Sequence, residues 1–392
     1  MAIKYIHQAD LDGKKVLARF DFNVPLQDGK IIDTSRVDRA LPTIKYILEN
    51  GAKKLILMSH HGRPKGKVNM DYSLGPVAEY LAEKLNQEVI FTESAIGCGV
   101  KELLTLKDTR IVLLQNLRFH PEEEKNDMNF AKELAVYGDI YVNDAFGAAH
   151  RKHASVYAIN TFYNKEAYGG LLLEQEVLAL NKILMSPKKP FVAIVGGAKV
   201  ADKIKTIEKL LINVDKLIIG GAMAYPFLKA KGQRVGTSLC SEDDVILATK
   251  ILKADRGNKI ELPCDHIVSE KFGGTPESCS SVNINDDKMG LDIGPSSVSK
   301  FSQILSTAKT VLWNGPMGAF ENTDYAAGTY ALCETIANLD AFTLVGGGDS
   351  VSAANKSGYA DKFSHISTGG GASLEYIEKG ELPGIQALKF GV

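Results

Sequence analysis

The segment FVAIVGGAKVADKIKTIEKL (residues 191–210) decides the fold, because it joins a strand, a tight turn and a helix in one stretch. Its first apolar run is typical of a buried strand, and apolar residues recur at helical spacing after the Gly196–Gly197 pair. Lys199 and Lys203 are four positions apart, so we expect them to share one helix face beside its amino end. A helix amino end binds anions through its free N–H groups, so the segment predicts a phosphate site; a solvated lysine face is the alternative.

The same alternation of short apolar runs and helical segments extends through the whole chain. Strands are expected at residues 14–20, 53–58, 88–91, 110–114, 139–142, 190–195, 215–220, 265–269, 309–313 and 341–345. Helices are expected at residues 35–50, 73–86, 126–137, 199–213 and 323–338. Apolar strands separated by helices indicate parallel sheets that are covered on both faces. So many strands overfill one sheet, and we therefore predict an α/β fold with two doubly wound domains.

One helix is expected to join the two domains. The segment YGGLLLEQEVLALNKIL (168–184) begins with a glycine pair and carries apolar residues at helical spacing. SPKKP (186–190) ends it, since proline disfavours helix at the residue before it. The domain boundary is therefore expected near residues 165–185, and a surface helix of the first domain is the alternative.

Composition excludes several classes of protein. Hydrophobic residues at 45% and charged residues at 24% are ordinary globular values, and the formal net charge of -1 argues against bulk binding to nucleic acid or anionic membrane. The 5 cysteines are scattered and form no C-x-x-C pair, so neither a disulfide framework nor a zinc site is expected. No apolar stretch approaches the roughly 20 residues that cross a bilayer. We expect a cytoplasmic protein.

Four loops that follow strands of the first half carry arginine or histidine together with other polar residues. They are RFDFNVP (19–25), MSHHGRPKG (58–66), LLQNLRFH (113–120) and NDAFGAAHRKH (143–153). Because the carboxyl ends of parallel strands share one edge of a sheet, these loops predict a basic cleft for a small anion, such as one with a carboxylate and a phosphate. Turns stabilised by Asp and Asn hydrogen bonds are the alternative for the first loop.

Glycine turns dominate the second half. IIGGAMAY (218–225), TLVGGGDSVSA (343–353) and ISTGGGASLEY (366–376) offer backbone N–H groups to phosphates. Asp349 is the candidate Mg²⁺ ligand, since Mg²⁺ takes one or two carboxylates plus nucleotide phosphates, and a helix N-cap is its alternative role. In WNGPMGAFE (313–321), Glu321 is placed to accept from ribose hydroxyls. Neither a Walker sequence nor a G-x-G-x-x-G fingerprint occurs, which weakens a dinucleotide site.

At these residues the chain resembles the phosphoglycerate kinases over nearly its whole length. The shared motifs occur in the family's order and spacing: RFDFNVP, SHHGRP, NLRFHPEEE, GGAKVADKI, WNGPMGAFE, GGGDS and STGGGASLE. The resemblance implies two Rossmann-like domains joined by an interdomain helix with a hinge. Residues 1–168 with 380–392 are expected to bind phosphoglycerate, residues 169–185 to form the helix, and residues 186–379 to bind nucleotide.

The resemblance also implies a reaction and its residues. The reaction is the reversible, Mg²⁺-dependent transfer of the acyl phosphate of 1,3-bisphosphoglycerate to ADP, giving 3-phosphoglycerate and ATP in glycolysis and gluconeogenesis. The expected phosphoglycerate ligands are Asp21, Phe22, Asn23, Arg36, His60, His61, Gly62, Arg63, Arg118 and Arg151. The expected nucleotide ligands are Gly197, Ala198, Lys199, Lys203, Gly221, Gly290, Asn314, Pro316, Glu321, Gly347, Gly348, Asp349 (also the metal ligand) and Ser350. The expected catalytic groups are Arg36, Lys199, Lys203 and the glycines Gly370 and Gly371.

Further expectations follow from the resemblance. Two half-sites on separate domains must close on each other, so we expect hinge bending, and we expect a monomer with only small-molecule partners. His61, Gln115 and Ala222 depart from the family pattern. A nicotinamide-dependent dehydrogenase and a non-catalytic anion sensor are the alternative functions. The dehydrogenase predicts a fingerprint glycine loop with an acidic residue roughly 20 positions on, which the sequence lacks, and a sensor would not need a basic cleft together with a separate nucleotide domain.

Overall fold

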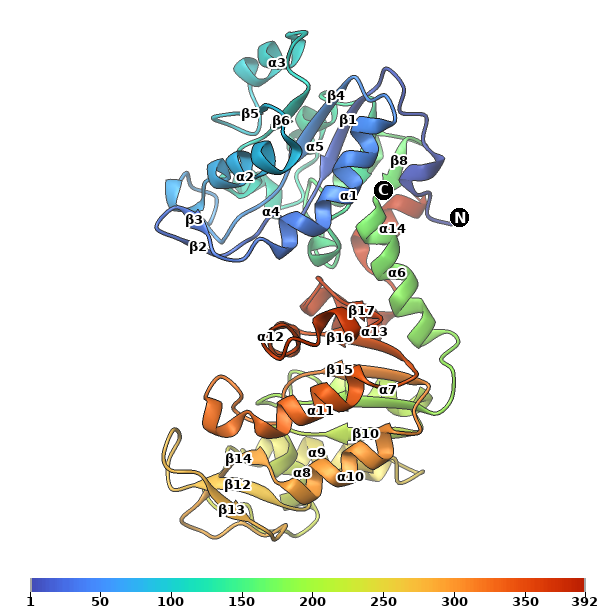
Figure 1. Cartoon of the computed structure of the whole chain (residues 1–392). Helices are drawn as coiled ribbons and strands as arrows, with labels where there is room; N and C mark the ends of the chain where they lie inside the picture. The colour runs from blue at the N-terminus through green and yellow to red at the C-terminus, as the bar shows by residue number, and fades with distance from the viewer. Residues whose placement is uncertain (1, 391–392) are drawn as a thin grey trace. The chain divides into compact units, whose positions relative to one another are not determined.

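Two six-stranded parallel sheets form the framework of the chain, of which the computed structural model describes residues 2–390 (Figure 1). The chain divides into two units, Met1–Leu178 with Glu381–Val392, and Ala179–Gly380. The division falls within helix α6 (Leu171–Leu184). One parallel sheet lies in each unit, which confirms the α/β fold with two parallel-sheet domains.

The sheet of the first unit has β1 near its centre, between β4 and β7. Its strands in spatial order are β5 (Val89–Phe91), β6 (Ile111–Leu113), β4 (Lys54–Met58), β1 (Lys15–Arg19), β7 (Ile140–Asn143) and β8 (Ala167–Gly169). Val16 pairs with Leu55 on one side and with Ile140 on the other. Because all neighbours are parallel, the loops that follow β1, β4, β6 and β7 leave the sheet at one edge.

The core of this unit lies between one sheet face and helices α1 (Ser35–Glu49) and α2 (Gly75–Leu85). Ile44 of α1 and Leu81 of α2 are fully buried against alternate strand residues such as Val16 and Leu57. Alternation follows from the two-residue strand period, and helical spacing gives each helix its apolar stripe. Each such side chain contributes about 1.5–3 kcal/mol to folding by leaving water.

Shorter elements complete the first unit. They are α3 (Cys98–Thr105), α4 (Pro121–Glu124), α5 (Met128–Ala135), and the 3₁₀ turns η1 (Ile6–Gln8), η2 (Met70–Tyr72), η3 (Leu117–Phe119), η4 (Phe146–Ala148) and η5 (Ala158–Phe162). A small hairpin, β2 (Leu26–Gln27) with β3 (Lys30–Ile31), was not predicted. Its turn is Asp28-Gly29 with positive φ at both residues, the sequence that type I′ hairpins prefer.

The last helix, α14 (Pro383–Phe390), packs within the first unit, against β8 and η5. The N–H of Gly384 donates to the carbonyl of Ala149 at 2.8 Å, and Ile385 is fully buried. A side chain at Gly384 would lie 2.6 Å from Val156, so the helix can approach this closely only at a glycine. Helix α14 is therefore part of the first unit, although it follows the second unit in the sequence.

The second unit repeats the doubly wound pattern. Its parallel sheet runs β11 (Ile260–Glu261), β10 (Lys216–Ile219), β9 (Phe191–Val195), β15 (Thr310–Asn314), β16 (Phe342–Gly346) and β17 (His365–Ile366). The helices of this unit are α7 (Ile204–Asn213), α8 (Ala224–Ala230), α9 (Glu242–Ala254), α10 (Pro295–Leu305), α11 (Ala327–Ala337), α12 (Gly348–Lys356) and α13 (Gly371–Lys379), with turns η6 (Thr323–Tyr325) and η7 (Ala360–Lys362). Trp313 lies in its core, 6.1 Å from the ring of Phe363.

Two expectations for this unit are wrong. The strand expected at 265–269 forms β12 (His266–Ser269) of a separate antiparallel sheet with β13 (Glu277–Cys279) and β14 (Met289–Ile293). The connection from β12 to β13 is too short for the helical crossover that parallel pairing needs. The helix expected from Lys199 begins only at Ile204, with Lys203 as its N-cap, because the N–H of Met223 donates to the carbonyl of Gly197 and holds the preceding loop in a non-helical path.

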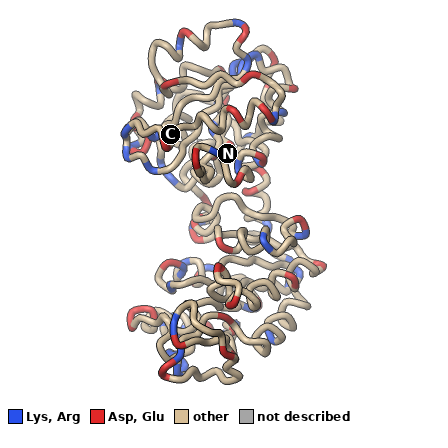
Figure 2. The backbone as a smooth tube through the Cα atoms, turned by 60° about the vertical axis from the view of Figure 1, so that its left-hand side comes forward, with Lys and Arg blue, Asp and Glu red and all other residues tan. Residues whose placement is uncertain are grey.

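Charge is mixed throughout. Figure 2 shows basic and acidic residues interspersed along the backbone of each unit, in agreement with the near-zero net charge. Within residues 2–390, no helix is both long enough and apolar enough to cross a lipid bilayer.

Candidate functional site

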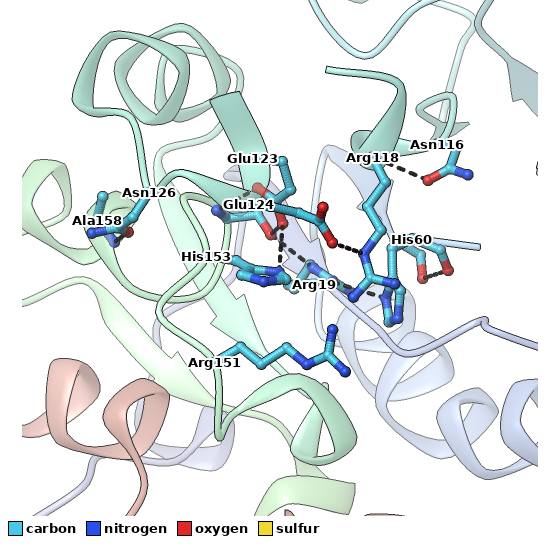
Figure 3. A network of polar contacts seen from close by, with 12 residues as sticks. Arg19, His60, Asn116, Arg118, Glu123, Glu124, Asn126, Arg151, His153 and Ala158 are labelled. Atoms are coloured by element: carbon cyan, nitrogen blue, oxygen red, sulfur yellow. Dashed lines mark hydrogen bonds and ion pairs between the residues drawn. The ribbon is translucent and has the colours of Figure 1, made fainter. Parts of the chain in front are cut away.

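A cluster of arginine and histidine side chains lies at the edge of the first sheet where four strands end (Figure 3). We call it the basic cluster, and its members are Arg19, Arg36, His60, Arg118, Arg151 and His153. Arg19 ends β1, His60 follows β4, Arg118 follows β6, and Arg151 follows β7. The four loops therefore lie at one edge of the sheet, as predicted from the parallel order of their strands.

Arg19 is the most deeply buried member of the basic cluster. Its Nε donates to Ser155 Oγ at 2.9 Å, and its Nη2 lies 3.1 Å from His60 Nδ1. Ser155 in turn donates through Oγ to Glu123 at 2.6 Å, and Glu123 is fully buried. A buried arginine is tolerated only with such partners, since an unpaired charge in the interior is expensive.

The histidines of the basic cluster are neutral. Burial, reinforced by the positive charges of Arg19 and Arg118, holds the pKa of His60 well below its usual value. Burial and the charge of Arg118 lower the pKa of His153 to about 3, although His153 Nδ1 lies 3.9 Å from Glu123. Both rings therefore serve as neutral hydrogen-bonding groups near pH 7.

Arg118 is held by groups of the loops after β4 and β6. Its Nη1 donates to the carbonyl of Gly62 at 2.7 Å, and its Nε lies 3.3 Å from Glu124. Burial, with a further contribution from Arg151, lowers the pKa of Arg118 to about 10. Asn116 fixes the start of the loop, because its Oδ1 accepts from the N–H of Arg118 at 3.0 Å. Arg118 thus remains charged at neutral pH.

Arg36 lies in the first turn of α1 and reaches the loop after β1. Its Nη1 donates to both oxygens of Asp21, each at 3.0 Å, and its side chain is 37% exposed. Asn23 accepts from the N–H of Gly62 at 2.8 Å through Oδ1, which joins the loops after β1 and β4. Arg36 is therefore oriented by a carboxylate while keeping donors accessible.

Some of the expected substrate ligands use their side chains for the fold instead. The ring of Phe22 is buried and stacks on Phe20 at 5.3 Å, and its N–H donates to Ser59. His61 is buried, with Nε2 at 2.9 Å from the carbonyl of Val24. Arg63, by contrast, is exposed. Only backbone atoms of Phe22 remain for a ligand.

The second unit holds a pocket of about 440 Å³, which we call the glycine-lined pocket. The expected nucleotide residues among its lining are Gly197, Ala198, Gly221, Gly290, Pro316, Glu321 and Asp349. Apolar residues that the sequence reasoning missed complete it: Tyr225, Leu239, Phe272, Met289 and Leu291. Leu239 and Phe272 are 67% and 68% exposed, which is unusual for large apolar side chains, and no motif in the sequence marks them.

Glycine is required where two loops of this pocket meet. Gly221 has φ of +64°, and a Cβ on it would lie 2.7 Å from the N atom of Gly197. No other residue fits both the backbone conformation and the space. The close approach leaves backbone atoms of both loops at the pocket wall.

Lys203 reaches back from the N-cap of α7 rather than sharing a helix face with Lys199. Its Nζ donates to the carbonyl of Gly196 at 2.6 Å and to Asn314 Oδ1 at 2.7 Å. Burial lowers the pKa of Lys203 to about 8, against the opposing effect of the nearby Asp349 carboxylate. Lys199 is exposed in the preceding loop. The expected common lysine face is therefore wrong, because the helix starts too late.

Glycines also cap the two helices that follow β16 and β17. Gly347, with φ of +89°, is the N-cap of α12, so the alternative N-cap role for Asp349 is wrong, and Asp349 lies in the first turn. Gly370, with φ of +48°, is the N-cap of α13, and Gly371 is its first residue. Ser350 is buried and accepts from the N–H of Gly315.

The glycine-lined pocket offers the carboxylate of Asp349 as a possible metal ligand. No group of three or more His, Cys, Asp or Glu side chains within residues 2–390 could hold a metal ion. Asp349 is a single exposed carboxylate beside the pocket. This donor set fits a Mg²⁺ ion that takes most of its ligands from nucleotide phosphates and water.

Comparisons with known proteins give one consistent result. The family model described as "Phosphoglycerate kinase" matches residues 6–380. A phosphoglycerate kinase of Clostridium novyi (strain NT) is 50% identical over 392 residues, with 98% of each chain covered, and one of Borreliella afzelii (strain PKo) is 48% identical over 382 residues, with 96% of each covered. The solved structure of phosphoglycerate kinase from Coxiella burnetii is similar with a TM-score of 0.89, at 37% identity and with 99% of each chain covered.

Proposed function

Because the chain belongs to the phosphoglycerate kinase family, we propose that its basic cluster binds the phosphoglycerate and its glycine-lined pocket binds ADP or ATP. The protein is a glycolytic kinase that transfers the acyl phosphate of 1,3-bisphosphoglycerate to ADP, giving 3-phosphoglycerate and ATP, and catalyses the reverse reaction. The observation that carries the residue assignment is the gathering of arginine and histidine side chains from four strand ends of one sheet. Fixed cationic donors of this kind match a small molecule with a carboxylate and a phosphate.

The phosphoglycerate side is assigned by chemistry. Arg36, Arg118 and Arg151 supply charge, and Asp21 orients Arg36. His60 supplies a neutral donor. The full proposed set is Asp21, Phe22, Asn23, Arg36, His60, His61, Gly62, Arg63, Arg118 and Arg151. The burial of the Phe22 ring limits that residue to its backbone groups.

The nucleotide side is assigned to the pocket and the helix ends beside it. The apolar lining suits a base, and the backbone N–H groups at the glycine-capped ends of α12 and α13 suit phosphates. Glu321 is assigned to the ribose hydroxyls. The full proposed set is Gly197, Ala198, Lys199, Lys203, Gly221, Gly290, Asn314, Pro316, Glu321, Gly347, Gly348, Asp349 and Ser350.

Transfer of the phosphoryl group needs positioning and charge neutralisation more than acid–base chemistry. The carboxylate of the acyl phosphate is a good leaving group, so no general base is required. We assign Arg36, Lys199, Lys203 and the N–H groups of Gly370 and Gly371 to the oxygens of the phosphoryl group in transit. Asp349 would hold Mg²⁺, which would neutralise phosphate charge when bound.

The reaction also requires the two units to cooperate. One substrate is assigned to each unit, and the phosphoryl group must pass directly between them, so we propose closure about a hinge at residues 165–190. Hydrogen-bond donors to the phosphoryl group stabilise its charge best when water is excluded from the site. We further propose a cytoplasmic monomer, in keeping with cysteines that are free within the described chain and with small-molecule substrates.

Replacement of Arg36 by alanine tests the assignment. Arg36→Ala should lower kcat by about 100-fold or more, because it removes a donor to charge that develops in transfer. The fold should persist, since the side chain is 37% exposed. A coupled assay of ATP formation from 1,3-bisphosphoglycerate and ADP measures the effect.

The matched control is Lys45→Ala, an exposed cation on the same helix α1. It should retain the wild-type kcat. A kcat close to wild type in a folded Arg36→Ala protein would remove Arg36 from the catalytic groups.

A further inference from the structure

The contact between Arg19 and His60 constrains the position of a proton. Nη2 of Arg19 lies 3.1 Å from Nδ1 of His60, and both residues are buried (Figure 3). A guanidinium has five N–H donors and no acceptor. Nδ1 must therefore accept with its lone pair, and it carries no proton.

The arginine that makes this contact is fixed on its other sides. Nε donates to Ser155 Oγ at 2.9 Å, and Nη1 donates to the carbonyl of Phe20. Ser155 uses its hydroxyl proton toward Glu123 at 2.6 Å, and its N–H donates to the other Glu123 oxygen at 2.9 Å. Three donors of Arg19 and both donors of Ser155 thus have defined acceptors, and Arg19 cannot turn away from His60 without breaking its bonds to Ser155 and Phe20.

The other ring nitrogen is left for a ligand. Among residues 2–390, no hydrogen bond involves Nε2 of His60, and 6% of the residue remains exposed. Burial and the charge of Arg19 hold the pKa of His60 well below its usual value, so the ring has one proton near pH 7. With Nδ1 occupied as an acceptor, that proton lies on Nε2.

We propose that Arg19 is a positioning residue that fixes the tautomer of His60, so that the ring presents an N–H at Nε2 to an oxygen of the phosphoglycerate. The second half of this statement rests on the proposed function. A ring in the opposite tautomer would present a lone pair to an anionic oxygen, which is repulsive. Arg19 therefore acts through His60 and needs no contact with the substrate.

The tautomer is measured directly by nitrogen NMR on the full-length, ligand-free protein labelled with ¹⁵N-histidine. The His60 signals are identified by their loss in His60→Gln. We expect Nε2 to give the signal of a protonated ring nitrogen and Nδ1 that of an unprotonated one. A proton on Nδ1 in the wild-type protein would overturn the proposal.

Arg19→Met removes the donors and should populate both tautomers. It should raise the KM for 3-phosphoglycerate about twofold where the two tautomers are equally populated, because the apparent affinity falls with the fraction of His60 in the binding tautomer, and it should leave the KM for ATP unchanged. If this variant does not fold because Glu123 is left unpaired, Arg19→Met combined with Glu123→Gln removes that charge, with the same expected results. A folded variant in which His60 keeps only the Nε2–H tautomer contradicts the proposal.

Arg110→Met is the matched control, because Arg110 also donates to a backbone carbonyl of the first unit, Leu48 at 2.7 Å, but does not contact His60. It should leave the His60 signals and both KM values unchanged. A tautomer that changes in Arg19→Met with an unaltered KM for 3-phosphoglycerate would support the role of Arg19 and contradict the proposed substrate site. The role of Arg19 and the proposed substrate site can therefore be contradicted independently of each other.

Discussion

At the residue scale, burial gives the two sites cations of different character. Arg118 keeps a pKa of about 10 although only 4% of its side chain is exposed, and so stays charged at neutral pH. Burial lowers the pKa of Lys203 to about 8, so a nearby charge can change the fraction of Lys203 that is protonated near neutral pH. A guanidinium resists deprotonation and an ammonium does not, which makes arginine a permanent anion ligand and lysine an adjustable one.

This difference predicts proton uptake on nucleotide binding. Phosphates favour the charged form of Lys203 and should raise its pKa, so ADP binding at about pH 8.5 should take up between roughly half and one proton, and binding at about pH 6.5 almost none. Calorimetry in two buffers of different ionisation enthalpy measures the uptake.

Lys203→Met is the control for this measurement, because it removes the group that titrates. An equal uptake in wild type and Lys203→Met at about pH 8.5 would assign the proton to another group.

At the element scale, the N-terminus of α5 is capped by a side chain, whereas those of α12 and α13 are capped by glycine. Asp127 caps α5 by accepting from the N–H groups of Asn129 and Phe130, both at 2.9 Å. Gly347 and Gly370 begin α12 and α13 with positive φ and no side chain. A side-chain cap gives the first N–H groups of a helix an acceptor, whereas a glycine gives them none.

The capping role of Asp127 is testable by Asp127→Ala. The change should lower the free energy of unfolding of the first unit by about 1 kcal/mol, because two N–H groups lose their acceptor. Urea denaturation measures this, and hydrogen exchange in the segment 127–135 should become faster.

Glu133→Ala, an exposed position on the same helix, is the control and should stay within about 0.5 kcal/mol of wild type. Equal stability of the Asp127 and Glu133 variants would mean that the cap contributes nothing.

At the scale of the whole molecule, helix α6 connects the two units. The division of the chain within α6 means that a single helix is shared by both units. Its first turn is tied to the first unit, where the N–H of Leu173 donates to Asp144 at 2.9 Å. Further along, Asn181 accepts from the hydroxyl of Tyr376 at 2.8 Å in the second unit. Helix α6 is therefore hydrogen-bonded within both units.

Closure of the two units predicts a change in molecular dimensions. Small-angle X-ray scattering should give a smaller radius of gyration with ATP analogue and 3-phosphoglycerate together than with either alone, since only the pair draws both half-sites together. Unchanged dimensions with both ligands at saturation would count against hinge bending.

Much of the architecture could be predicted because its determinants are local. The apolar runs at 53–58 and 191–195 and the helical spacing at 35–50 specify β4, β9 and α1 almost to the residue. The arginine-bearing loops could be predicted to converge because parallel strands place their carboxyl ends together. Features that depend on residue type and on spacing along the chain can therefore be predicted from the sequence.

The errors arose where distant segments compete with local preference. Helical spacing places Lys199 in α7, but the bond from Met223 to Gly197 delays the helix to Ile204. The apolar run at 265–269 was expected in the parallel sheet, whereas β14 pairs with it antiparallel. Neither partner is a neighbour in sequence.

The α/β class, most strands of the two parallel sheets and the arginine-bearing loops could be predicted from the sequence, because strand and helix periods and strand-end loops are local properties of the chain. Only the tertiary structure decided that Glu123 and Ser155 would hold Arg19 against His60, since these residues belong to separate loops and burial alone makes their proton positions definite. The apolar wall of the glycine-lined pocket was decided in the same way, by side chains such as Leu239 and Phe272 that carry no motif.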